Sequence, residues 1–409
     1  MALKASLLAT TAAGIVSSVW AALWTFPSML LSAFLVAWGA EAAQFLISQG
    51  LALAILAWLQ TLPEFAVEAV IAWEAGGDTA ACFVSSPPPG CHAHLAIANF
   101  TGAIRLLVGV GWPMIYFVAA IFRRESGGRF QPIRLGAEHS VEVLGTLPPL
   151  LYFVWVWYKG SLDLVDAAVL VAMYVAYLTV LWRFPPQSEE SLADAPRVSR
   201  WAYTRPGWRR PVAIAAIFAA GGFLIYVTAH PFLDSMLAVA TTLGVSHFVF
   251  VQWVAPFVSE FPEKVSAFHW AKRVSTAPMA LMNMLSSNVN QWTVLAAMIP
   301  IVYSMSSGHP AALPFDGTQR EEILLTVAQS LVAVLLLVRM KLEWWDALLL
   351  FVLWLAQFIV AGWRDEITII YGVWAAVLLL SWIWSRPTAP AIFWNLVRGR
   401  RREAEALAG

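Results

Sequence analysis

The sequence predicts an all-α polytopic membrane protein of about eleven transmembrane helices, and three observations lead to this fold class. The chain has 409 residues, of which 60% are hydrophobic and 12% are charged. Charged residues make up about a quarter of an ordinary soluble domain. Apolar runs of about 20 residues, enough to cross a bilayer, recur along the chain. Basic residues gather in every second loop between these runs, as in the cytoplasmic loops of membrane proteins.

The expected elements follow from the apolar runs in chain order. We expect membrane-spanning helices at residues 8–48, 50–75, 94–122, 140–158, 162–183, 211–243, 245–268, 276–305, 321–340, 344–362 and 366–385. A long hydrophilic segment containing "PPQSEESLADAPR" separates two groups of five spans. The sequence therefore predicts a first five-helix repeat at 1–183, a cytoplasmic linker at 184–210, a second, inverted repeat at 211–362, and an extra C-terminal helix with a basic tail at 363–409.

The distribution of charge predicts orientation and excludes one class of partner. Arginine and lysine follow the third, fifth, seventh and ninth spans and end the chain, which places the N-terminus outside and the C-terminus in the cytoplasm. The formal net charge is zero, so no global basic field attracts nucleic acid. We expect an integral protein of the cell (inner) membrane whose partners are the lipid bilayer and inorganic cations. The sequence does not set the oligomeric state.

Two cysteines lie in a single loop. Cys82 and Cys91 end the stretch "CFVSSPPPGC" between the second and third spans, in a loop that the charge pattern places outside. Outer compartments are oxidising, so a disulfide is expected there. Two free thiols in a cytoplasmic loop are the alternative.

The two halves share an interrupted apolar helix. "LAWLQTLPEFAVEAV" in the first half and "VQWVAPFVSEFPEKVSAF" in the second each carry Pro-Glu near the middle, at Pro63-Glu64 and Pro262-Glu263. Interrupted hydrophobic segments at corresponding positions of two halves point to the binding site of a secondary transporter. Because the second half is inverted, we expect Glu64 and Glu263 to face each other near the bilayer midplane.

Oxygen-bearing side chains surround both interruptions. Glu260 and Glu263 are three residues apart on one helix, and Asn283, Ser287 and Asn290 form one stripe on the next helix. Calcium takes six to eight oxygen ligands and prefers carboxylates. The pattern therefore predicts a cation-binding cavity.

These stretches resemble the sodium/calcium exchangers and the wider cation/calcium antiporter superfamily, whose two alpha-repeats carry G-T-S-L-P-E and then G-N-x-x-G-S-N. The first repeat here reads "LQTLPE" at 59–64 and "ANFTGAI" at 98–104, and the second reads "VSEFPE" at 258–263 and "MNMLSSN" at 282–288. The resemblance implies cation ligands at Glu64, Glu263, Asn99, Asn283, Ser287, Asn288, Thr61 and Ser259. We add Glu260, a carboxylate where the family has serine. The resemblance implies transported calcium and sodium but no organic cofactor.

The first repeat departs from the family pattern. Ala103 and Ile104 stand where the family has serine and asparagine, and Leu59 and Val258 replace the motif glycines. Coordination is therefore expected to depend more on the second repeat, and the usual ion stoichiometry does not carry over.

Arg105 is a cation inside the third span. An intramembrane charge is costly and is almost always paired or turned toward a cavity. We expect Arg105 to pair with an acid in or near the site, Glu260 or Glu64. The alternative is that its side chain reaches toward the outer surface.

The expected function is secondary active antiport, calcium against sodium, by alternating access around Glu64 and Glu263. One alternative is a cation/proton exchanger of the same superfamily, which the first-repeat substitutions favour. Another is a non-transporting membrane sensor or scaffold. The sequence contains neither H-E-x-x-H nor G-x-S-x-G, so we do not expect an enzyme.

Overall fold

The computed structural model describes residues 2–46, 58–83, 91–123, 128, 130–183, 192, 195–382 and 387–408, with the backbone alone for 2–18, 80 and 361. Parts of five expected features lie outside the described residues. These are the end of the first span, the start of the second span, the tip of the cysteine loop, most of the N-terminal part of the linker and the end of the last span.

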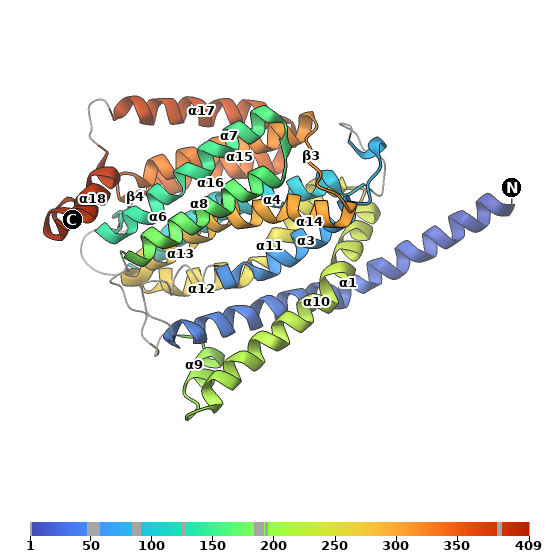
Figure 1. Cartoon of the computed structure of the whole chain (residues 1–409), viewed down its shortest axis with the longest axis horizontal. Helices are drawn as coiled ribbons and strands as arrows, with labels where there is room; N and C mark the ends of the chain where they lie inside the picture. The colour runs from blue at the N-terminus through green and yellow to red at the C-terminus, as the bar shows by residue number, and fades with distance from the viewer. Residues whose placement is uncertain are drawn as a thin grey trace.

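The described chain is a bundle of helices with two very short β-ribbons (Figure 1). The elements of the first half are α1 (Ala2–Ala43), η1 (Gln44–Leu46), α3 (Leu62–Ala75), η2 (Ala80–Cys82), α4 (Ala93–Leu106), the π-helix η3 (Leu107–Gly111), α5 (Trp112–Phe122), β1 (Ile133–Arg134), η4 (Ala137–His139), α6 (Ser140–Gly145), α7 (Leu147–Lys159), β2 (Ser161–Leu162) and α8 (Leu164–Arg183).

The second half begins with the short helix at the end of the linker. Its elements are α9 (Arg197–Tyr203), α10 (Arg209–Leu243), α11 (His247–Ser259), α12 (Phe261–Lys272), η5 (Val274–Thr276), α13 (Ala277–Asn290), the π-helix η6 (Gln291–Leu295), α14 (Ala296–Ser307), β3 (Leu313–Pro314), α15 (Gly317–Leu337), β4 (Lys341–Leu342), α16 (Trp344–Ile359), η7 (Ala361–Trp363), α17 (Arg364–Ser381), α18 (Thr388–Val397) and α19 (Arg401–Ala408).

Each expected span is mostly helical in its described residues, but several spans are divided. The second and seventh spans are broken beside their prolines, and the third and eighth each contain a π-turn, at 107–111 and 291–295. The apolar pattern of the sequence does not predict the π-turns. By length and composition, five helical segments of the described part are long and apolar enough to cross a membrane.

The two β-ribbons relate the halves to each other. β1 pairs with β4 and β2 pairs with β3, so each ribbon joins one strand from each half, and the ribbons lie at opposite ends of the bundle (Figure 1). The loops beside them repeat one ion pair. Lys159 bonds Asp166 in the first half, and Arg339 bonds Asp346 at 2.5 Å in the second. This exchange of matching elements fits an inverted repeat.

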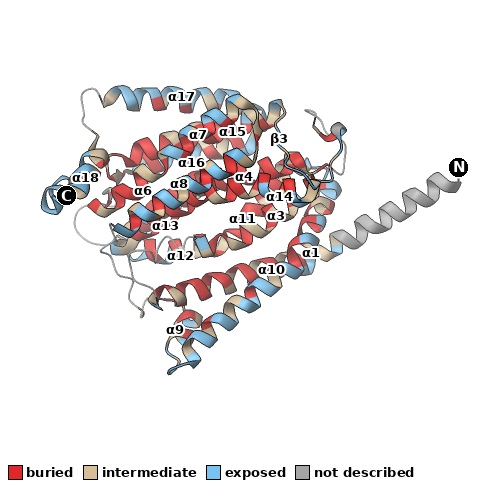
Figure 2. Ribbon diagram, in the orientation of Figure 1, coloured by how far each residue is buried: buried red, intermediate tan, exposed pale blue. Residues whose placement is uncertain are grey.

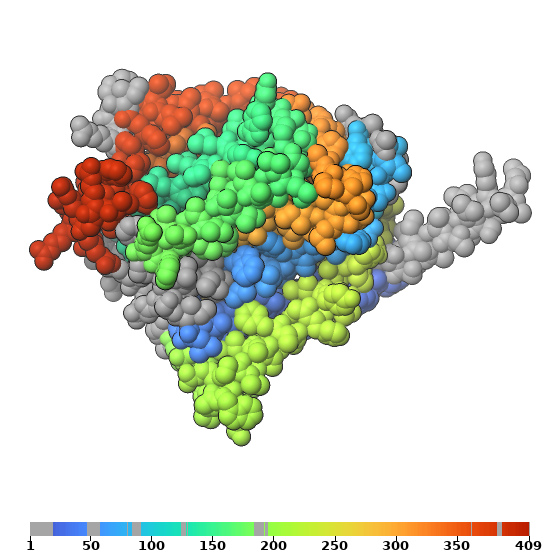
Figure 3. Space-filling model, in the orientation of Figure 1, coloured from blue at the N-terminus to red at the C-terminus, as the bar shows by residue number. Residues whose placement is uncertain are grey.

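Helices α1 and α10 form a long pair beside the bundle. They pack along each other and run obliquely to the other helices (Figure 1). In the space-filling view, the yellow-green α9–α10 segment lies along the lower edge of the molecule (Figure 3). Each helix of the pair contains an internal proline, Pro27 or Pro231. The pair is therefore a separate layer against the more compact bundle.

Burial separates a polar core from an apolar periphery. Helices α4 and α13 are buried at almost every position, whereas α17 is largely exposed (Figure 2). Large apolar side chains point outward on several helices, including Trp20, Val165, Tyr226 and Ile369. A soluble monomer rarely exposes such extensive apolar surface, and a bilayer accommodates it.

Helix α4 approaches α11 closely because residue 102 is glycine. A Cβ atom at Gly102 would lie 1.8 Å from the backbone oxygen of Gln252. No side chain fits there, so Gly102 permits the backbone contact that brings the two repeats together.

Candidate cation-binding site

Two helix breaks build the site. Residues 58–60 are helical, the chain turns at Thr61, and α3 starts at Leu62. In the second repeat, Glu260 separates α11 from α12. Proline lacks an N–H and clashes with the carbonyl four residues earlier, so it ends a helix but fits the first turn of the next. Pro63 and Pro262 occupy that first turn. Each proline is followed by a glutamate, which is thereby fixed at a helix N-terminus inside the bundle.

The predicted glutamates converge. Glu64, Glu260 and Glu263 are all at most 2% exposed, and Glu64 lies within electrostatic range of the other two. Gln291 joins them, because its Nε2 donates to both oxygens of Glu64 at 3.2 and 3.1 Å and to Oε1 of Glu260 at 2.9 Å. One amide thus holds carboxylates from both repeats. Ser287 lies beside Glu263.

Asparagines tie the break in the first repeat to helix α13. Asn283 Nδ2 donates to Gln60 Oε1 at 3.1 Å, and Asn290 Nδ2 donates to the Thr61 hydroxyl at 2.6 Å. Thr61 in turn donates to the carbonyl of Trp58 at 2.9 Å. These bonds cross between the repeats and fix the geometry of the broken helix.

Several buried polar atoms of the site have no hydrogen-bond partner within the described part of the chain. These atoms are both carboxylate oxygens of Glu263, Oε1 of Glu68, Oδ1 of Asn99, Asn283 and Asn290, Oε1 of Gln291, Oγ of Ser287 and Nδ2 of Asn288. Buried polar atoms normally find partners, so a group of unpartnered oxygens needs an explanation. Such oxygens suit a dehydrated cation, because the cation requires several oxygen ligands with free lone pairs.

Two predicted ligands, Asn99 and Ser259, form hydrogen bonds outside the group of Glu64, Glu260 and Glu263. Asn99 Nδ2 donates to Oε2 of Glu68 at 2.6 Å, so Asn99 contacts a carboxylate one turn beyond Glu64. Ser259 donates its hydroxyl to the carbonyl of Ala255 at 3.0 Å. The lone pairs of the Ser259 oxygen can still bind a cation, but the hydroxyl proton is donated within its own helix.

The repeated sequence motifs do not include Glu68, Gln291 and Lys264, which the structure adds to the candidate site. Glu68 follows Glu64 by one helical turn, and Gln291 follows Ser287 by one turn, so helical spacing alone could have indicated both. Lys264 is 6% exposed and pairs with Glu260 four residues earlier, which is also ordinary helical spacing. None of the three residues lies within the repeated motifs.

The expected partner of Arg105 was wrong, although the expected pairing was right. Arg105 is 1% exposed, so its side chain does not reach the surface. It pairs with Glu322 of α15 rather than with Glu260 or Glu64, and donates to Gln357 Oε1 at 3.0 Å. Arg105 is six residues beyond Asn99 and therefore lies about 120° around α4, away from the site.

Glu322 is the centre of this second network. Its Oε1 lies 2.6 Å from Nε of Arg364 in an ion pair, and its Oε2 accepts from Gln252 Nε2 at 2.9 Å and forms an ion pair with Arg105. The Arg105 guanidinium also lies 5.0 Å from the centre of the Trp253 ring. The network connects α4, α11, α15, α16 and α17, and it shares no residue with the candidate site.

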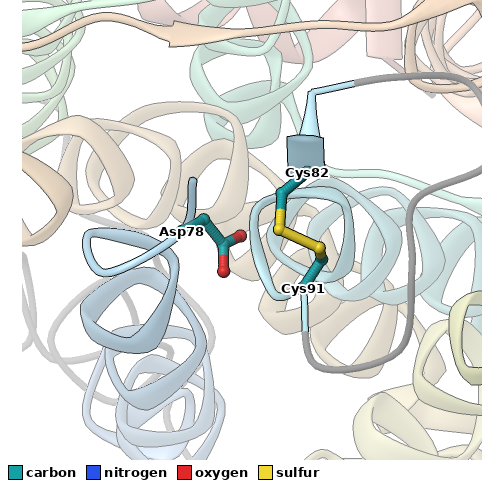
Figure 4. A group of neighbouring side chains, drawn as sticks. All are labelled: Asp78, Cys82 and Cys91. Atoms are coloured by element: carbon teal, nitrogen blue, oxygen red, sulfur yellow. A yellow bond between two sulfur atoms is a disulfide. The ribbon is translucent and has the colours of Figure 1, made fainter. Parts of the chain in front are cut away.

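The two cysteines form a disulfide, as expected (Figure 4). Within the described residues, Asp78, Cys82 and Cys91 are also the only three metal-ligating side chains with ligand atoms within 4.8 Å of one another. The disulfide removes the thiolates that a metal would need. Asp78 instead accepts from the backbone N–H groups of His92 and Ala93 at 2.8 and 2.7 Å. This cluster therefore anchors the start of α4 and is not a metal centre.

Comparison with known proteins identifies the family. A family profile described as sodium/calcium exchanger protein matches residues 16–183 and 213–363, which is more than half of the chain. The chain belongs to the sodium/calcium exchanger family. It is an integral membrane cation/calcium exchanger and not an enzyme.

Solved structures of the family resemble the chain to different degrees. The chain is 31% identical to the H+/Ca2+ exchanger CAX, with a TM-score of 0.81, and the match covers 93% of this chain and 92% of that one. It is 18% identical to the sodium-calcium exchanger NCX_Mj, with a TM-score of 0.53, covering 84% and 98% respectively. The second likeness shows the fold alone. No curated protein matches the chain in sequence.

Proposed function

We propose that this exchanger moves calcium against protons by alternating access around Glu64 and Glu263. The observation that carries the proposal is the buried group of carboxylates from both repeats, in which Gln291 holds Glu64 and Glu260 while both oxygens of Glu263 lack a partner in the described part. The same carboxylate oxygens can hold either a calcium ion or a proton. The two cargoes would therefore compete for one site.

The choice of calcium rests on the donor set. The proposed ligands are hard oxygens from carboxylates, amides and hydroxyls, which suit calcium better than softer metals. We retain the predicted set as Glu64, Glu263, Asn99, Asn283, Ser287, Asn288, Thr61, Ser259 and Glu260. Glu68 joins the set through its contact with Asn99.

The choice of protons over sodium rests on two observations. Ala103 and Ile104 replace the serine and asparagine of the family motif, which removes oxygen ligands from the first repeat. The identity to CAX, which is an H+/Ca2+ exchanger, extends over nearly the whole chain at 31%. Sodium/calcium exchange is the alternative that the experiment below tests.

Alternating access is proposed to involve the α1–α10 pair. A cavity of about 490 Å³ lies where α1, the end of the linker and α12 meet, and its lining includes Glu41, Ser266 and Pro262. Glu41 accepts from Ser266 Oγ at 2.7 Å. Because Pro262 directly precedes Glu263, this cavity approaches the site. Movement of α1 and α10 against the bundle would open or close the route.

We also propose the boundaries of the two repeats. We assign one repeat to 1–183 and its inverted partner to 211–362, with 184–210 as the linker and 363–409 as the C-terminal addition. The reciprocal strand pairing between halves and the repeated ion pairs Lys159–Asp166 and Arg339–Asp346 support this division.

The coupling ion is tested by radioactive calcium uptake into vesicles containing the purified protein. One set of vesicles receives an acid interior with equal sodium on both sides, and a second receives a sodium gradient at constant pH. We expect uptake with the acid interior, and we expect an ionophore that collapses the pH gradient to stop it. The sodium gradient is expected to give little uptake.

Two results would contradict proton coupling. Uptake driven by the sodium gradient at constant pH, and insensitive to collapse of the pH gradient, would assign the chain to sodium/calcium exchange. No uptake under either gradient, together with calcium binding by the same preparation, would favour the sensor or scaffold.

A further inference from the structure

The site contains a buried cation of its own. Lys264 is 6% exposed, its ammonium bonds Oε2 of Glu260, and it lies within electrostatic range of Glu263. Glu260 is in turn linked to Glu64 through Gln291. The ammonium is therefore part of the carboxylate cluster and not a solvated surface charge.

The position of Lys264 is unfavourable for α12 itself. The residue lies in the first turn of the helix, where the backbone dipole disfavours positive charge. Burying an ammonium also requires compensation by a paired acid. The stability of α12 therefore does not account for a lysine at this position. The reason for Lys264 must lie in its pairing with the carboxylate of Glu260.

The charges of Glu64, Glu260, Glu263 and Lys264 together match one divalent ion. The three carboxylates contribute three negative charges when ionised, and Lys264 contributes one positive charge. These four groups have a net charge of minus two, which one calcium ion neutralises, and Glu68 beside Asn99 would add one more negative charge when ionised. Without the ammonium, the three carboxylates would carry three negative charges when ionised. They could then bind calcium and one monovalent cation together.

We propose that Lys264 is a tethered monovalent cation that occupies the position beside Glu260 and so excludes sodium from the site. The residue would then determine specificity without binding calcium itself. The inference rests on the proposed calcium transport, because it explains why the site takes a divalent ion and no accompanying sodium. It assigns Oε2 of Glu260 to the ammonium and Oε1 to Gln291, so under this inference Glu260 is no longer one of the calcium ligands.

The test measures sodium binding directly in the purified full-length protein at fixed pH. Radioactive sodium and radioactive calcium binding are compared in the wild type, Lys264→Gln and the double variant Glu260→Gln/Lys264→Gln. In the wild type, about 150 mM sodium is expected to leave calcium affinity nearly unchanged. In Lys264→Gln, sodium binding becomes saturable and the same sodium concentration weakens calcium binding by at least about fivefold. The double variant lacks the freed carboxylate and is expected to regain insensitivity to sodium.

Glu260→Gln alone provides an independent arm in case Lys264→Gln does not fold. It releases the ammonium toward Glu263 and is expected to weaken calcium binding by about tenfold or more. A purely structural ion pair would instead lower thermal stability and leave the calcium affinity of the folded protein unchanged. That result, or a Lys264→Gln variant as insensitive to sodium as the wild type, would overturn the inference.

The readout separates this inference from the proposed function. If the wild type fails to take up calcium under a pH gradient, the proposed function fails. Sodium binding by Lys264→Gln requires neither transport nor calcium, so it decides the role of Lys264 separately.

Discussion

Glu64→Gln and Glu263→Gln are each expected to abolish calcium transport. Each substitution removes a buried negative charge from a site where both repeats contribute carboxylates. Losing one partner of a buried charge interaction costs about 2–5 kcal/mol, so calcium affinity should fall at least about thirtyfold. Calcium binding and uptake by the two purified variants provide the measurement.

The matched control is Glu321→Gln, which makes the same chemical change at an exposed position of α15. It should bind and transport calcium as the wild type does. If either Glu64→Gln or Glu263→Gln retained wild-type affinity while Glu321→Gln behaved normally, the symmetric two-carboxylate site would be wrong.

Arg105→Gln is expected to destabilise the fold without altering the site. The substitution leaves Glu322 buried with fewer partners, and breaking a buried ion pair costs about 3–5 kcal/mol. The thermal unfolding midpoint should therefore fall strongly. Calcium affinity of the folded fraction should change by less than about twofold, because a few tenths of a kcal/mol is the usual extent of coupling between separate groups.

The double variant Arg105→Gln/Glu322→Gln distinguishes an ion pair from simple loss of packing. Removing both charges eliminates the unpaired carboxylate, so the double variant should be more stable than Arg105→Gln alone. A large loss of calcium affinity in folded Arg105→Gln would contradict the separation of the two networks and restore a direct role for Arg105 at the site.

The features of the candidate site that depend on residues adjacent in sequence could be predicted. A proline and an acid in the middle of an apolar run are visible without a structure, and their repetition identified Glu64 and Glu263 as candidates. The eleven spans were also predictable, since hydrophobic length is a property of contiguous residues. The disulfide followed from two cysteines confined to one loop.

The partners that depend on distant packing were not predictable. Arg105 and Glu322 are 217 positions apart in sequence, and the packing of α4 against α15 brings them together. Gln291 likewise reaches Glu64 from the other repeat. The two π-turns, at 107–111 and 291–295, have no simple local signature in the sequence.

The most direct test of the central claim is the position of the bound cation. A crystal structure of the wild type soaked with calcium, with strontium as an anomalous-scattering substitute, would locate it. We predict one peak between Glu64 and Glu263, with carboxylate oxygens about 2.3–2.6 Å from calcium, and loss of that peak in Glu263→Gln. A peak at Glu322 or beside Asp78 that persists in Glu263→Gln, with none between the two glutamates, would contradict the account.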